Sequence, residues 1–149
     1  MRIRRLKDED VEAVVQVWYA SGRAAYPFIE RWRVFTLAKA RGVFREDILA
    51  VCEVWVAETE HEIVGYLALK GSYVDRLYVS PTHQRRGIGT ALLAFAMQRN
   101  PAGLELHTHQ TNTAACAFYE QHGFVAVKFG LSPPPENEPD VEYHWRPRP

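Results

Sequence analysis

The chain has 149 residues, of which 47% are hydrophobic and 24% are charged, as in an ordinary folded domain. Its 18 basic and 18 acidic side chains cancel, so no overall charge attracts nucleic acid or an anionic membrane. No apolar run is long enough to span a membrane, and the N-terminal residues are too polar for a signal peptide. Two cysteines without a C-x-x-C pair argue against a disulfide framework and a structural metal. We therefore expect one cytoplasmic domain over residues 1–149, with no metal, no nucleic-acid partner and no membrane partner.

The N-terminal third predicts a short strand followed by two helices. Residues 2–6 alternate in polarity, which indicates an edge strand. The carboxylate of Asp8 is placed to cap the first helix, and a Tyr-Pro pair beginning at Tyr26 marks the end of that helix. The second helical stretch carries the aromatic residues Phe28 and Trp32, which with Tyr26 either fill ordinary helix packing or line a substrate pocket.

The middle of the chain predicts three consecutive strands. Residues 43–50 precede them as a short helix or a loop. Residues 51–58 and 63–70 are apolar and are separated by a four-residue polar turn, the pattern of a β-hairpin. A Gly-Ser turn then leads into a third strand, residues 73–79, so we expect an antiparallel meander.

The second half of the chain alternates helices and strands. A helix is predicted over residues 88–99, and the strand at 104–108 should run parallel to the strand before that helix because a helical crossover joins them. A further helix, 113–122, precedes strands at 124–129 and 141–145, which flank a proline-rich loop. The order β-α-α-β-β-β-α-β-α-β-β predicts an α/β protein with one mixed, mostly antiparallel sheet of about seven strands and helices on both faces.

The segment between the third strand and the helix at 88–99 carries the strongest functional signal. It reads Gln84-Arg85-Arg86-Gly87-Ile88-Gly89 and is called the phosphate loop below. A glycine-containing loop that opens a helix gathers backbone N–H groups at the positive end of the helix dipole, which favours a phosphate. A dinucleotide motif needs Gly or Ala where Leu92 stands, and a P-loop needs Gly-Lys followed by Ser or Thr. The loop therefore predicts a site for a phosphate-bearing ligand of another kind.

This loop resembles the acyl-CoA loop of the GCN5-related N-acetyltransferases, Gln/Arg-x-x-Gly-x-Gly/Ala. A second stretch, from Asn112 to Phe124, resembles that family's Asn-x-x-Ala-x-x-Phe-Tyr-Glu-x-x-Gly-Phe motif. The resemblance implies the acyl-CoA N-acyltransferase fold and transfer of an acetyl group from acetyl-CoA to a primary amine. A small-molecule amine is the first expectation for the acceptor. The alternatives are a protein lysine or N-terminal amine, and a non-catalytic acyl-CoA sensor.

The resemblance also implies which residues hold acetyl-CoA. Backbone amides from Arg85 to Thr90 would bind the pyrophosphate, and the main chain of residues 77–79 would pair with the pantetheine arm where the parallel strands splay apart. Asn112 would contact the pantetheine, although capping of the following helix explains this residue equally well. The predicted cofactor-binding set is Leu77, Tyr78, Val79, Gln84, Arg85, Arg86, Gly87, Ile88, Gly89, Thr90, Asn112, Ala115 and Phe118.

Acetyl transfer to an amine needs an acid and a base. Tyr119 stands at the family's acid position, and a phenol with an ordinary pKa of about 10 stays protonated at neutral pH and can protonate a thiolate. The rival interpretation of Tyr119 is a buried aromatic with a satisfied hydroxyl. Tyr73 replaces the family's glutamate base, so Asp75 is the first choice for the base. His107 and His109 are the rivals because histidine titrates near neutrality.

The strand at 73–79 is expected to present these groups together. Strict alternation places Tyr73, Asp75, Leu77 and Val79 on one face. The resemblance implies direct attack of the amine through a tetrahedral intermediate, whose oxyanion accepts a hydrogen bond from a backbone N–H near Val79. It also implies that residues 22–32 and 131–140 set specificity. A homodimer formed by edge-to-edge pairing of two sheets is compatible with the predicted fold, but no residue pattern decides it.

Overall fold

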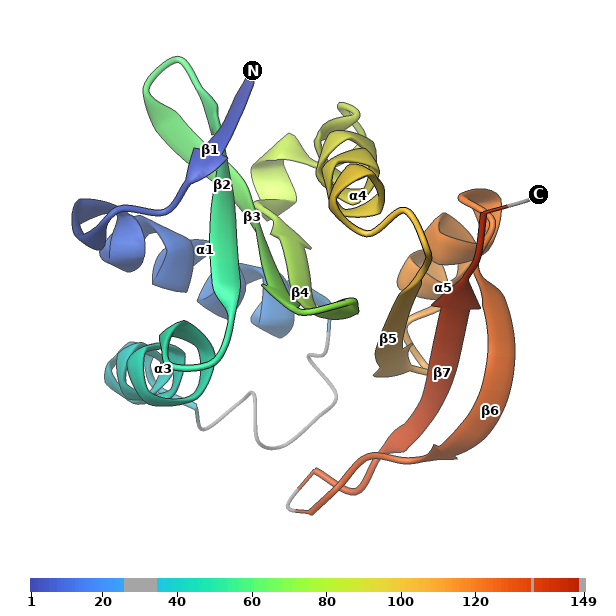
Figure 1. The fold of residues 1–149 in the computed structure, drawn as a ribbon. Coiled ribbons are helices and arrows are strands. Elements are labelled where there is room, and N and C mark those ends of the chain that lie inside the picture. The colour runs from blue at the N-terminus through green and yellow to red at the C-terminus, as the bar shows by residue number, and fades with distance from the viewer. Residues whose placement is uncertain (26–34, 135, 148–149) are drawn as a thin grey trace.

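A seven-stranded sheet with the strand order β1-β2-β3-β4-β5-β7-β6 runs through the protein (Figure 1). The structure is a computed structural model that describes residues 1–25, 35–134 and 136–147. The strands are β1 (Arg2–Arg5), β2 (Glu53–Thr59), β3 (Glu62–Lys70), β4 (Tyr73–Val79), β5 (Leu104–His109), β6 (Val125–Leu131) and β7 (Pro139–Trp145). Only β4 and β5 pair in parallel among these strands, so the predicted meander and the predicted crossover are both confirmed.

Helices cover both faces of the sheet, as the sequence predicts (Figure 1). The helical segments are η1 (Asp8–Asp10), α1 (Val11–Ala25), α3 (Leu37–Val43), η2 (Phe44–Leu49), η3 (Pro81–His83), α4 (Ile88–Arg99) and α5 (Thr113–Gln121). On one face, α1, α3 and η2 bury residues such as Trp18 and Phe44 against Tyr66 of β3. On the other face, α4 and α5 bury Leu92 and Tyr119 in a second core, which includes Leu67 of β3 and Tyr143 of β7. These are called the α1 face and the α4 face below.

Two predictions for the N-terminal third needed correction or completion. Asp8 does not cap the first helix, because the chain enters α1 through a 3₁₀ turn that already includes Asp8. Most of the ambiguous residues 43–50 form η2, Phe44–Leu49, a short π-helical continuation of α3 whose Phe44 and Ile48 are buried. The aromatic cluster of Tyr26, Phe28 and Trp32 and the break at Tyr26 lie outside the described residues, so those interpretations stay predictions.

A nearly enclosed ion pair fixes the N-terminal strand to the rest of the domain. The Arg4 guanidinium lies 2.7 Å from Asp10 Oδ2 and 3.2 Å from Glu58 Oε2, which joins β1 to η1 and β2. Asp10 Oδ2 also accepts a hydrogen bond from the backbone N–H of Lys7 at 2.7 Å. The hydrogen bond from Arg4 lowers the pKa of the Asp10 carboxyl below its ordinary value. The side chains of Arg4 and Asp10 are only 12% and 7% exposed, so this network serves the fold.

The second half of the chain follows the predicted boundaries closely. The side chain of Asn112 accepts a hydrogen bond from the backbone N–H of Ala115 at 3.1 Å, so its predicted role as the cap of α5 is confirmed. β6 and β7 form the expected hairpin around the proline-rich loop. Within residues 1–25, 35–134 and 136–147, no helix is long and apolar enough to cross a membrane.

Candidate active site

The parallel strands β4 and β5 open into a cleft. Both strands lie wholly within the described residues, and their ladder has one register pair, Tyr73 with Glu105. The backbone N–H of Glu105 also bonds to the carbonyl of Ser72 at 3.0 Å. Beyond this point the strands diverge, and a cavity of about 1560 Å³ lies between them. Residues from both faces of the sheet line this cleft, including Trp18 on the α1 face and Phe118 on the α4 face, so the cleft passes through the sheet.

The register of β4 directs backbone groups into the cleft. The N–H of Ser80 bonds to the carbonyl of Val64 at 2.7 Å, so these two residues form a hydrogen-bonded pair of the antiparallel β3–β4 ladder. Hydrogen-bonded and non-hydrogen-bonded pairs alternate along such a ladder. The N–H and C=O groups of Leu77 and Val79 therefore point away from β3 and toward β5. Two donors already occupy the Val79 carbonyl, Ser21 Oγ at 3.0 Å and Gln84 Nε2 at 3.3 Å, which leaves the Val79 N–H as the group directed into the cleft.

Asp75 is the inserted residue of a β-bulge, and this overturns the expectation that residues 73, 75, 77 and 79 share a face. Ala68 pairs with Arg76 and Leu69 pairs with Val74, so Asp75 has no partner of its own on β3. One inserted residue reverses the alternation on one side of the bulge. As a result Val74 packs in the core of the α4 face together with Leu77 and Val79. Tyr73 instead lies on the α1 face, where it contacts His107.

The phosphate loop has the backbone conformation that its glycines predict. Gly87 has φ +80°, the left-handed region, and is the N-cap of α4. The first helical hydrogen bond runs from the N–H of Ala91 to the carbonyl of Gly87, so the amides of Ile88, Gly89 and Thr90 precede the helical ladder. A Cβ built on Gly87 meets nothing within 4 Å, so the space beside this residue is open.

The predicted cofactor-binding residues fall into two groups in the structure. Most of them line the cleft, namely Leu77, Tyr78, Val79, Gln84, Arg85, Gly87, Gly89, Thr90, Asn112, Ala115 and Phe118. The side chain of Ile88 is buried in the core of the α4 face, and Arg86 is not among the lining residues. Both still belong to the loop backbone. Their predicted role therefore depends on main-chain groups.

Helix α5 supplies the wall opposite the phosphate loop. Phe118 packs over Gly89, where an added Cβ would lie 3.4 Å from the Phe118 ring. Tyr119 lines the cleft and is otherwise buried, with its ring 5.2 Å from that of Phe118 and 5.4 Å from that of Phe124. His122 links the helices, because Nδ1 contacts the Phe118 carbonyl at 2.7 Å and Nε2 contacts Thr90 Oγ1 at 3.2 Å. Tyr119 is therefore held in a rigid setting on the cleft wall.

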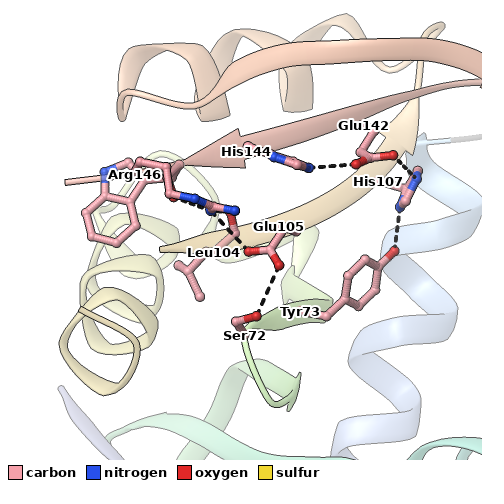
Figure 2. A network of polar contacts seen from close by, with 9 residues as sticks. Ser72, Tyr73, Leu104, Glu105, His107, Glu142, His144 and Arg146 are labelled. Carbon is pink, nitrogen blue, oxygen red and sulfur yellow. Dashed lines mark hydrogen bonds and ion pairs between the residues drawn. The ribbon is translucent and has the colours of Figure 1, made fainter. Parts of the chain in front are cut away.

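Polar side chains gather on the α1 face of the cleft (Figure 2). Tyr73 Oη lies 2.8 Å from His107 Nδ1, and His107 Nε2 lies 3.4 Å from Glu142 Oε1. The other oxygen of Glu142 lies 2.6 Å from His144 Nε2.

The other two candidate bases have different partners. Asp75 Oδ2 lies 3.5 Å from Arg76 Nε, and the Arg76 guanidinium stands 4.0 Å above the Trp18 ring. His109 pairs instead with Glu136 at 3.1 Å. The candidate bases Asp75, His107 and His109 therefore occupy three different settings within one cleft.

Sequence reasoning missed several residues of this site. Ser21 is one of them, although it falls seven residues after Val14 on the buried stripe of α1, and a buried serine needs a hydrogen-bond partner. Glu142 and His144 alternate with buried Val141 and Tyr143 on β7. This alternation was a signal that both point to the less covered face of the sheet.

A strand pair opened by a cleft, with a glycine loop and a helix N-terminus beside it, can hold a long phosphate-bearing ligand. A family model described as Acetyltransferase (GNAT) domain matches residues 50–126. The peptidyl-lysine N-acetyltransferase YiaC of Escherichia coli is 31% identical over 128 residues, which are 84% of each chain. The peptidyl-lysine N-acetyltransferase YjaB of Salmonella typhimurium is 31% identical over 125 residues, 83% of each chain. The solution structure of apo YjaB from Escherichia coli matches with a TM-score of 0.81 at 25% identity, covering 97% of this chain and 96% of that chain.

The chain therefore belongs to the GNAT acetyltransferase family, and the predicted acyl-CoA N-acyltransferase fold is confirmed. It is an N-acetyltransferase with acetyl-CoA as its co-substrate. The cleft fits that co-substrate, because the open side of Gly87 leaves room for a pyrophosphate and the inward amide groups of Leu77 and Val79 can pair with an extended amide-containing arm. In the part of the chain that the structure describes, no group of three or more His, Cys, Asp or Glu side chains is arranged to hold a metal ion.

Proposed function

We propose that this enzyme acetylates the side-chain amine of lysine in proteins or peptides. The observation that carries the proposal is the continuous cleft, which has the phosphate loop on the α4 face and acidic side chains on the α1 face. Asp75, Asp140 and Glu142 line the cleft there together with the cations Arg76 and Lys128, so acidic groups are in excess. A lysine ammonium, with an ordinary pKa of about 10.4, is cationic at neutral pH and is attracted to such a surface. Two relatives over more than four-fifths of the chain carry peptidyl-lysine acetyltransferase names, which supports the same acceptor.

The roles of the chain's own residues follow from this arrangement. When bound, acetyl-CoA supplies the activated acetyl thioester. The amides of residues 85–90 would hold its pyrophosphate, and the backbone of Leu77 and Val79 would align its arm along β4. The Val79 N–H, which points away from β3, would donate to the thioester carbonyl oxygen, because preorganised donors stabilise developing negative charge. Tyr119 would provide the proton for the departing sulfur, because its hydroxyl belongs to a ring fixed in the cleft wall.

A small amine is the second candidate acceptor and was the first expectation from the sequence. One observation favours it. The streptothricin acetyltransferase of Escherichia coli is 27% identical over 100 residues, 58% of each chain. The cleft does not distinguish the two acceptors by charge, since small amines are also cationic at neutral pH.

The proposal is tested by mixing the protein with acetyl-CoA and a short peptide that has a blocked N-terminus and one lysine. Release of free thiol and the mass of the peptide are followed together. The matched control is the same peptide with an Nε-acetylated lysine, which offers no amine. Acetylation of the free-lysine peptide alone is the expected result. Thiol release in the presence of small amines, together with no acetylation of the lysine peptide, would contradict this proposal and support a small amine as the acceptor.

A further inference from the structure

Tyr73, His107 and Glu142 form a continuous polar chain across three neighbouring strands, β4, β5 and β7 (Figure 2). The contacts measure 2.8 Å from Tyr73 Oη to His107 Nδ1 and 3.4 Å from His107 Nε2 to Glu142 Oε1. All three residues line the cleft on the α1 face. We propose that this chain is a proton relay that removes the proton which the acceptor ammonium must lose before it attacks. The relay rests on the proposed function, because it serves a cationic amine.

The carboxylate of Glu142 fixes the direction of the relay. Its hydrogen bond with His144 lowers the pKa of Glu142 below the ordinary value, so Glu142 is an anionic acceptor at neutral pH. An anionic carboxylate favours a proton on the facing nitrogen, His107 Nε2. Nδ1 of a neutral His107 then carries the lone pair and accepts the hydrogen bond from the Tyr73 hydroxyl. The Tyr73 hydroxyl then donates to His107 Nδ1, and the Nε2 side of the ring faces the Glu142 carboxylate at 3.4 Å.

Tyr73 passes a proton on and is not itself the base. Burial raises the pKa of Tyr73 to about 12, so the phenol stays neutral at physiological pH. In the relay, the ammonium gives one proton to Tyr73 Oη while the Tyr73 hydroxyl proton moves to His107 Nδ1. The positive charge passes from the amine to the imidazolium, which Glu142 stabilises, and no net charge is created. His107 is 42% exposed and can return the proton to water, which closes the cycle.

Tyr73 is the catalytic residue of this proposal, and His107 and Glu142 are positioning residues that act through it. Several other titratable groups shape the local charge around the relay. They are Asp75 and Arg76 on β4, Asp140 and His144 on β7, and Lys128 on β6. Asp75 stays the sequence-based prediction for the base, so the variant Asp75→Asn belongs in the same experiment.

Steady-state rates of Tyr73→Phe, His107→Gln and Glu142→Gln, measured across pH 6 to 10 with the lysine peptide, test the relay. We expect kcat/KM at neutral pH to fall about 100-fold for the first two variants, the usual contribution of proton transfer, and less for the third. The difference in kcat/KM between these variants and the wild type should shrink as pH rises, because a larger fraction of the lysine amine is then neutral without the relay. Acetyl-CoA affinity by calorimetry should not change. Glu105→Gln is the matched control. Glu105 lies on β5 like His107, but its carboxylate contacts Ser72 and Arg146 and does not take part in the relay (Figure 2).

An acceptor that is already neutral separates the relay from a structural effect. A peptide with an aminooxy group in place of the lysine amine is uncharged at neutral pH, so no ammonium proton has to be removed before the nitrogen attacks. We expect Tyr73→Phe and His107→Gln to acetylate this peptide at nearly the wild-type rate. Equal losses on both acceptors, or a wild-type pH profile in Tyr73→Phe, would overturn the relay alone. A wild-type enzyme that acetylates no lysine peptide would overturn the proposed function and the relay with it.

Discussion

The parts of the sheet on either side of the cleft use similar polar side chains for different purposes. In the part formed by β1 to β4, helices cover both faces, and Arg4 and Asp10 form an ion pair that is almost closed to solvent. In the part formed by β5, β7 and β6, His107 and Glu142 lie on a face that borders the cleft, where Tyr73 of β4 contacts His107. An enclosed charge pair stabilises the fold, whereas a chain of titratable groups beside a cleft is available for chemistry.

The largest effect is expected from Tyr119→Phe. Loss of the hydroxyl removes the proposed proton donor to the departing sulfur, so turnover should fall by about 100-fold or more. Acetyl-CoA affinity should change little, because the ring and its packing remain. Thiol release and calorimetry measure the two quantities. Tyr143→Phe is the matched control, since that buried hydroxyl bonds Glu120 and its loss should leave turnover unchanged. Equal turnover in Tyr119→Phe and the wild type would remove the acid role.

The next largest effect is expected from breaking the ion pair between Arg4 and Asp10, and it should change stability without changing turnover. Asp10→Asn leaves the Arg4 guanidinium without its main partner, and the free energy of unfolding should fall by about 2–3 kcal/mol. Turnover at a temperature where the variant is folded should not change. Glu12→Gln is the control, because the ion pair of Glu12 with Arg41 is exposed and should contribute nothing measurable. Urea unfolding measures both variants. If Asp10→Asn had the same free energy of unfolding as the wild type, the contacts of Arg4 with Asp10 and Glu58 would not be what holds β1 in place.

The same ion pair predicts a pH dependence with a definite sign. The pKa of Asp10 is lowered in the folded protein by the hydrogen bond from Arg4, so its stabilisation is complete above the unfolded value of about 3.9. The stabilisation is lost as pH falls through the lowered folded pKa. Wild type and Asp10→Asn should therefore differ at neutral pH and converge below pH of about 4. A difference that persists in acid would assign the effect to packing instead.

Gly87→Val separates the loop backbone from the rest of the domain. A β-branched residue at φ +80° costs about 1–3 kcal/mol, and the loop can avoid this strain by changing its conformation. Acetyl-CoA affinity should fall about 10- to 100-fold while the domain stays folded. Gly71→Val is matched to it, since Gly71 also has positive φ and open space but lies in the β3–β4 turn. Calorimetry should show normal affinity for Gly71→Val, and equal losses in the two variants would remove the loop assignment.

The smallest effect is expected from Ser21→Ala. This change removes the shorter of two hydrogen bonds to the Val79 carbonyl, which costs about 1 kcal/mol of stability. Gln84 continues to hold the carbonyl, so acetyl-CoA affinity should fall less than about tenfold. Thermal unfolding and calorimetry check the two values. A loss of binding as large as in Gly87→Val would mean that α1 orients the strand more strongly than Gln84 does.

Local patterns were enough to predict the strands, helices α4 and α5 and the glycine loop that opens α4, but not the start of α1 or the helical form of η2. Gly87 and the cap at Asn112 depend on neighbours within a few residues, and such short-range chemistry is visible in the sequence. The bulge at Asp75 depends on how β3 and β4 align, so alternation alone placed Tyr73 on the wrong face. The contact of Glu142 with His107 joins strands far apart in the chain and follows only from the β5–β7 register. Roles of single residues in catalysis remain predictions.

The central claim is that acetyl-CoA binds in the cleft between β4 and β5, and the most direct measurement is an amide NMR titration of the ¹⁵N-labelled protein. We expect the largest shifts at the amides of Leu77, Val79 and residues 85–90, with little change at β1 and β2. Shifts concentrated on β1 and β2, with the β4 and loop amides unmoved, would contradict the claim and place the co-substrate elsewhere.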